Sequence, residues 1–117
     1  MTLADLRIAC LELLPPDANR REEASVHLAF VAQADLVPAL AAAAEEAIRR
    51  PHKPLKARIA HAIKTGELRA GLDADREATR LRLLFDGLAI QVVTTPPRRR
   101  STKWAVELSD EHLAALR

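Results

Sequence analysis

The sequence is poor in several residue types that small secreted or β-rich domains depend on. It contains one cysteine, Cys10, three glycines and no tyrosine, and only 3% of its 117 residues are aromatic. A single cysteine cannot form an internal disulfide, which fits a reducing cytosol. The abundance of Ala, Leu, Glu and Arg, with few β-branched runs, favours helix throughout.

Long apolar runs are also lacking. The longest run ends at Glu45 and Glu46, well short of the roughly 18 residues that a membrane span needs. The N-terminus carries Asp5 and has no basic segment followed by an apolar one, so it does not have the pattern of a signal peptide. We therefore expect a single cytoplasmic domain with no membrane contact. The net charge of +2 is too small to indicate a partner.

Apolar periodicity and the prolines divide the chain into about six helices. We expect them near residues 2–14, 22–34, 36–50, 55–65, 73–94 and 109–116. Pro51 and Pro54 predict a break between the third and fourth helices, and Gly66 is placed to end the fourth. The residues expected to cap helix N-termini are Asp17 or Asn19, Asp35, Asp73 and Ser109.

The helix at residues 73–94 has two apolar faces. One is a stripe of large side chains, widened by Leu84 and Ala89, and the other holds Leu83 and Ile90 with Gly87 beside them. In so short a chain, we expect one face to be buried in the core and the other against a second subunit. The stripe consists of Leu81, Phe85, Leu88 and Val92.

The second helix is apolar around its whole circumference from Ala24 to Ala34, which predicts a position in the middle of a bundle. His27 and Gln33 are polar exceptions. They are either satisfied by backbone or water, or they orient a ligand in a cavity between helices. Asp86, in the long helix, is an exposed residue, a pocket acid or a partner across a subunit interface.

Nothing in the sequence predicts catalysis. The four histidines show no metal-ligand spacing among themselves or with Cys10, and neither a Gly-rich phosphate loop nor a nucleophile-elbow serine is present. We expect no enzyme, no metal and no cofactor. The basic run Arg98–Arg100, with Trp104 nearby, is either a solvated loop or a site that contacts nucleic acid. The second alternative would make the chain a nucleic-acid-binding protein.

Four features in order resemble the C-terminal regulatory domain of TetR-type transcriptional repressors. They are the leucine-leucine-proline break at Leu13–Asp17, the turn at Gly66–Arg69, the cap at Asp73 and the segment Asp86–Ala89. The resemblance implies an antiparallel, all-α bundle that binds an effector and forms a homodimer. Its last two helices would pair with those of a twofold mate.

The resemblance also implies site residues and a partner class. The effector would be a small hydrophobic or amphipathic molecule held between the second, third and fourth helices. The pocket candidates are His27, Phe30, Gln33, Ile59, His61 and Asp86. The interface candidates are Leu81, Phe85, Leu88, Val92, Leu113 and Leu116.

Relatives of this kind carry a helix-turn-helix of roughly fifty residues before the regulatory domain, and this sequence shows none. We therefore expect the sequence to be a fragment or a truncated gene product, in contact with DNA only through the missing N-terminal domain. The alternative is a helical dimerisation or interaction module without a small-molecule ligand, its cavity filled by side chains.

Overall fold

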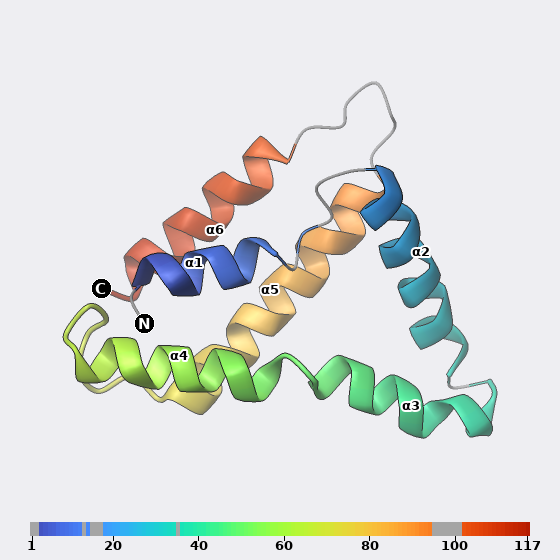
Figure 1. Ribbon diagram of the computed structural model, residues 1–117, viewed down its shortest axis with the longest axis horizontal. Coiled ribbons are helices and arrows are strands. Elements are labelled where there is room, and N and C mark those ends of the chain that lie inside the picture. Colours follow the sequence, from blue (N-terminus) through green and yellow to red (C-terminus); the bar gives the residue numbers. More distant parts are fainter. Residues whose placement is uncertain (1–2, 13, 15–17, 35, 95–101) are drawn as a thin grey trace.

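The computed structural model in Figure 1 describes residues 3–12, 14, 18–34, 36–94 and 102–117. These residues form six α-helices and no strand, which confirms the predicted all-helical class. The molecule measures 43 × 37 × 18 Å, so it is only about two helix diameters thick. The helices are α1 (Leu3–Leu11), α2 (Ala18–Gln33), α3 (Pro38–Arg49), α4 (His52–Lys64), α5 (Ala74–Thr94) and α6 (Lys103–Ala115).

Helix α5 crosses the middle of the molecule and packs against α2, α4 and α6 (Figure 1). It begins at the predicted cap, because Asp73 Oδ1 accepts hydrogen bonds from the backbone amides of Asp75 (3.0 Å) and Arg76 (3.2 Å). Asp75 and Glu77 then place negative charge in the first turn, where the helix dipole favours it.

The core is built around the predicted stripe of α5. Leu81, Phe85, Leu88 and Val92 are between 0% and 5% exposed, and side chains of α1, α4 and α6 cover them. Cys10 of α1 belongs to the same cluster, and burial raises the pKa of its thiol to about 11. The thiol therefore stays protonated at neutral pH, in the form that packs as a small apolar side chain.

The predicted break between the third and fourth helices is confirmed. Helix α3 ends at Arg49 and α4 begins at His52, with Pro51 between them and Pro54 in the first turn of α4, where no helical amide partner is required. At the other end of α4, Gly66 has a φ of 82° and its amide donates to the Ile63 carbonyl at 3.2 Å. Glycine reaches this left-handed conformation at no steric cost, so the predicted stop is confirmed.

The structure corrects the position predicted for the second helix. Helix α2 lies at an edge, where it packs mainly against α5 and α3, and Val26 is 65% exposed. Half of its apolar side chains are alanines, which bury little area, and the core cluster is made by larger side chains of the other helices instead. Asn19 lies inside α2 and is not its cap; Asp17 and Asp35 lie outside the described residues.

The start of the last helix is also corrected. Helix α6 begins at Lys103, and Ser109 lies in its middle with 1% of its surface exposed. The Ser109 hydroxyl donates to the Ala105 carbonyl, one turn earlier, at 2.7 Å. A serine satisfied in this way fits a helix interior. The acidic residues after Ser109 are typical of the first turn of a helix, which is why the sequence predicted a start there. In the structure, Ala105, Ser109 and Leu113 are buried on one face of a helix that begins earlier.

Replacing Phe85 with alanine should lower the free energy of unfolding by about 3–5 kcal/mol, because it removes a fully buried aromatic ring and leaves a cavity. Urea denaturation followed by circular dichroism measures the change. Val26→Ala, at an exposed position of α2, is the matched control and should cost less than about 1 kcal/mol. Equal losses in the two variants would contradict the observed core.

Candidate functional site

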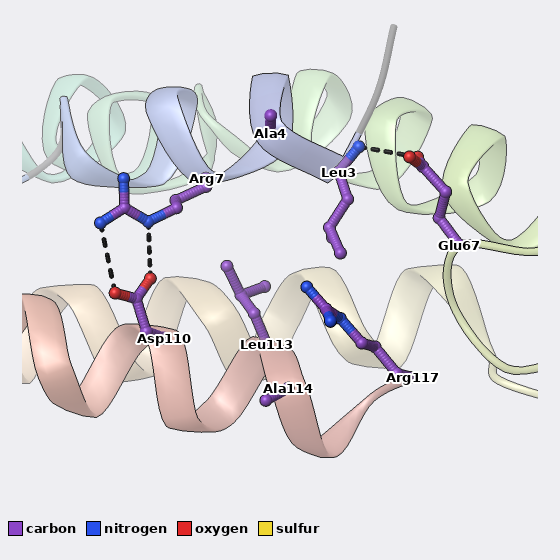
Figure 2. Close-up of a pocket in the computed structure, with 8 residues that line it drawn as sticks. All are labelled: Leu3, Ala4, Arg7, Glu67, Asp110, Leu113, Ala114 and Arg117. Carbon is purple, nitrogen blue, oxygen red and sulfur yellow. Dashed lines mark hydrogen bonds and ion pairs between the residues drawn. The ribbon is translucent and has the colours of Figure 1, made fainter.

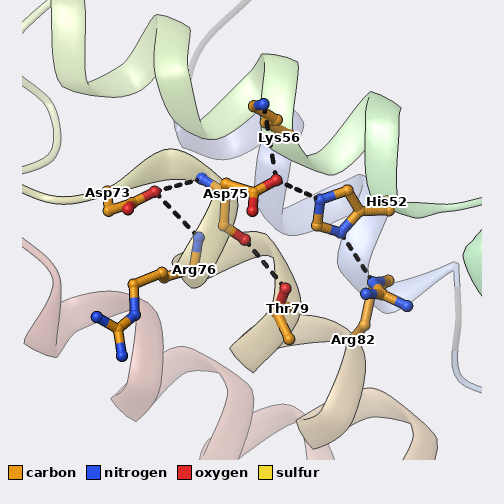
Figure 3. A network of polar contacts seen from close by, with 7 residues as sticks. All are labelled: His52, Lys56, Asp73, Asp75, Arg76, Thr79 and Arg82. Carbon is orange, nitrogen blue, oxygen red and sulfur yellow. Dashed lines mark hydrogen bonds and ion pairs between the residues drawn. The ribbon is translucent and has the colours of Figure 1, made fainter.

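A row of polar side chains runs from the start of α4 across one side of α5 (Figure 3). His52 Nε2 lies 2.8 Å from Asp75 Oδ1, and Arg82 Nε donates to His52 Nδ1 at 3.0 Å. A guanidinium can only donate, so Nδ1 is an acceptor and the ring hydrogen lies on Nε2, from where it is donated to Asp75. The two contacts together fix one neutral tautomer of His52.

Asp75 is the carboxylate that ends this row. The hydrogen bond from His52 is the main reason that the pKa of Asp75 lies below its ordinary 3.8, and Lys56, whose Nζ is 3.6 Å from Oδ1, acts in the same direction. Because these groups are exposed, each ion pair adds little stability. Their role is geometric, since they join the first turn of α4 to the first turn of α5.

Asp86 extends the row toward α2. It lies one helical turn after Arg82 on the same side of α5, near the contact between α5 and α2. Partial burial raises the pKa of the Asp86 carboxyl above 3.8, while the nearby charges of Arg82 and His27 oppose that rise. The row therefore consists of two acids and three basic side chains, in the order Asp75, His52, Arg82, Asp86 and His27.

The structure brings together some of the predicted pocket residues and separates the others. His27 and Asp86 lie near each other across the α2–α5 contact, and the half-buried Phe30 follows His27 by one turn. Ile59 is 0% exposed inside the core, so it is not on a cavity wall. His61 is exposed on α4 and Gln33 is exposed at the end of α2, apart from the row.

A pocket of about 630 Å³ lies elsewhere, between α1 and α6 (Figure 2). At one end, Arg7 forms a two-pronged pair with Asp110, with distances of 2.6 Å and 3.2 Å, which lowers the pKa of Asp110 and raises that of Arg7. At the other end, the Leu3 amide donates to Glu67 Oε2 at 2.7 Å. None of the predicted pocket residues lines it; the lining residues are Leu3, Ala4, Arg7, Glu67, Asp110, Leu113, Ala114 and Arg117.

The predicted interface residues are all buried within the single chain. Leu81, Phe85, Leu88, Val92, Leu113 and Leu116 are between 0% and 5% exposed, so they offer almost no surface to a second subunit. No second subunit is present to test the predicted interface, but burial within the protomer favours the other apolar face of α5 for it. The free apolar face is the one that carries Leu83 and Ile90, which are 66% and 42% exposed.

Sequence reasoning missed His52, Arg82 and Asp75 as members of one cluster. Asp75 and Arg82 are seven residues apart, a spacing that places them two turns apart on one side of a helix, and this signal was present. His52 gave no such signal, because its two partners lie 23 and 30 residues away. Only the packing of α4 on α5 brings it to them.

These observations define an all-helical domain with a polar row beside an unpartnered apolar helix face, and no described helix is long and apolar enough to cross a membrane. The chain matches the family of BetI-type transcriptional repressors, C-terminal region, over residues 3–117. It belongs to that family, so it is a TetR-type regulatory domain. Searches of curated proteins and of solved structures found no match.

The two aspartate carboxyls of α5, Asp75 and Asp86, should titrate on opposite sides of 3.8. Asp86 should have a pKa above 3.8 because of its partial burial, and Asp75 a pKa below 3.8 because of His52. Carbon-detected NMR titration of the carboxyl groups measures both in one experiment. Arg82→Gln should raise the pKa of Asp86 further, since it removes a cation that stabilises the carboxylate. A pKa of Asp86 below that of Asp75 would contradict the arrangement.

Proposed function

We propose that the domain binds a small-molecule effector and forms a homodimer through the outer faces of α5 and α6, and thereby controls DNA binding by an N-terminal helix-turn-helix. The observation that carries the proposal is the unpartnered apolar face of α5, in a chain that belongs to a repressor family. The resulting domain would respond to a ligand at the α2–α5 contact and transmit the response through the dimer.

The dimer surface has the side chains that close helix packing requires. Leu83, Gly87 and Ile90 follow a spacing of four and three residues, so they form one stripe along α5. A Cβ built on Gly87 meets nothing within 4 Å, so the stripe is open at its centre and another helix could approach it closely. On α6, Leu108 is 45% exposed and adds apolar surface.

The wild-type chain should be a dimer at low micromolar concentration, measured by size-exclusion chromatography with light scattering. The double variant Leu83→Glu/Ile90→Glu should raise the Kd at least about 100-fold, because it buries unpaired charges at the interface. Its helical content should stay that of the wild type, since both side chains are exposed in the protomer.

The control for this experiment is Val26→Glu/Leu36→Glu, which places the same charges on exposed apolar positions outside α5 and α6. It should remain a dimer. A monomeric wild-type chain, or a dimer that survives the α5 substitutions, would refute the proposed interface.

The effector site is proposed at the contact between α2 and α5. Asp86 supplies a carboxyl with a raised pKa at an exposed position, His27 and Arg82 lie near it and supply hydrogen-bond donors, and Phe30 supplies a half-buried ring. A few polar groups beside an apolar surface are typical of sites that orient small ligands. Carboxyl groups with a raised pKa gather at functional sites, which supports the same choice.

Thermal-shift measurements against hydrophobic and cationic compounds should reveal a ligand that raises the melting temperature. Asp86→Asn should weaken binding of that ligand about tenfold, which corresponds to one lost charge-assisted hydrogen bond of about 1.4 kcal/mol. Ala114→Leu, which narrows the pocket between α1 and α6, should leave binding unchanged. If Ala114→Leu weakened binding and Asp86→Asn did not, the ligand would bind in the pocket between α1 and α6 instead.

The second candidate function is a helical dimerisation module without a small ligand. It is favoured if the chain is a dimer but no compound shifts its melting temperature. The observation in its favour is that neither the polar row nor Phe30 lines the pocket between α1 and α6.

A further inference from the structure

The solvent-facing side of α4 is a basic surface that the proposed function does not use. No acidic residue occurs between Glu46 and Glu67, and this interval holds Arg49, Arg50, Lys53, Lys56, Arg58 and Lys64. The inner side of α4, with Leu55, Ile59 and Ala62, is buried against α1 and α5. Of the cations in α4, Lys53, Lys56 and Lys64 are exposed, whereas Arg58 is half-buried.

Two of the lysines form the centre of this surface. At about 100° per residue, Lys53, Ala57, Ala60 and Lys64 fall within an arc of about 60°, and all four are exposed. Lys53 and Lys64 are separated by about 16 Å along the helix. Among the described residues, no carboxylate forms an ion pair with either lysine, whereas Arg49 pairs with Glu45 and Lys56 lies near Asp75.

The partner that this surface fits is a polyanion with regularly spaced charge. The two residues that lie between the lysines on this arc are Ala57 and Ala60, so the arc carries no large apolar side chain to insert into a lipid layer. Duplex DNA carries a negative charge about every 1.7 Å along its axis, so a 16 Å row of cations can contact more than one phosphate.

We propose that the outer face of α4, centred on Lys53 and Lys64, binds the phosphate backbone of duplex DNA without reading its sequence. The choice of DNA rests on the proposed role in transcription, but the binding itself needs neither the effector site nor the dimer interface. Contacts of this kind set affinity and salt dependence and carry no sequence information.

The test is fluorescence anisotropy of the chain with a random-sequence duplex over a series of salt concentrations. The variant Lys53→Gln/Lys64→Gln should flatten the slope of log K against log salt by about 1.8, which corresponds to two lost phosphate contacts. Glutamine has nearly the helix propensity of lysine, so circular dichroism should be unchanged. The matched control, Arg76→Gln/Lys103→Gln, removes the same charge from exposed positions on α5 and α6 and should keep the wild-type slope.

Three results would overturn the inference. The first is a wild-type slope in the Lys53→Gln/Lys64→Gln variant. The second is loss of the slope in Arg98→Gln/Arg99→Gln/Arg100→Gln alone, which would assign the binding to residues outside the described part of the chain. The third is preference of the chain for phosphatidylserine vesicles over DNA, which would make the partner a membrane surface. A monomeric chain that still shows the predicted slope loss would refute the dimer and leave this inference standing.

Discussion

Burial of one stripe of α5 is the constraint on which the rest of the structure depends. Leu81, Phe85, Leu88 and Val92 leave almost no surface exposed, and three other helices must gather around them to achieve this. Burial of large apolar side chains is the dominant favourable term in folding. Once this stripe faces inward, the geometry of the helix sends Leu83 and Ile90 outward and leaves Arg82 and Asp86 on the flank.

The flank and the outer face then acquire different properties from the same helix. The flank lies beside α2 and α4, so its charged residues lie near His27 and His52 and form the polar row. On the outer face, Leu83 and Ile90 keep 66% and 42% of their surface exposed, so apolar area remains in solvent at a cost that a second subunit could relieve. A change in the packing of α2 on α5 would act on both at once, because α5 is a rigid element shared by them.

The break at Pro51 has a consequence for the polar row. It ends α3 and starts α4 at His52, so His52 lies at the first position of α4 and close to the first turn of α5. In Figure 1, α3 lies beyond the start of α4, where it packs against α2. The prolines thus separate an edge pair of helices from the helices that make the core.

The family assignment and the geometry are independent of each other. The match to BetI-type repressors covers residues 3–117 and rests on sequence, whereas the open face of α5 and the basic face of α4 are properties of the folded chain. The proposals for dimerisation, effector binding and DNA contact draw on both.

The amino-acid sequence by itself determined the helical class, the break at Pro51, the cap at Asp73 and the stop at Gly66, because each of these depends on local periodicity, ring geometry or capping. It also showed that α5 has two apolar faces. Only the tertiary structure decided which face is buried, since both have the same period and differ only in what packs against them. The tertiary structure also decided the position of α2, which is apolar around its circumference but lies at an edge with Val26 exposed. It likewise decided the contacts of His52, whose partners are distant in sequence.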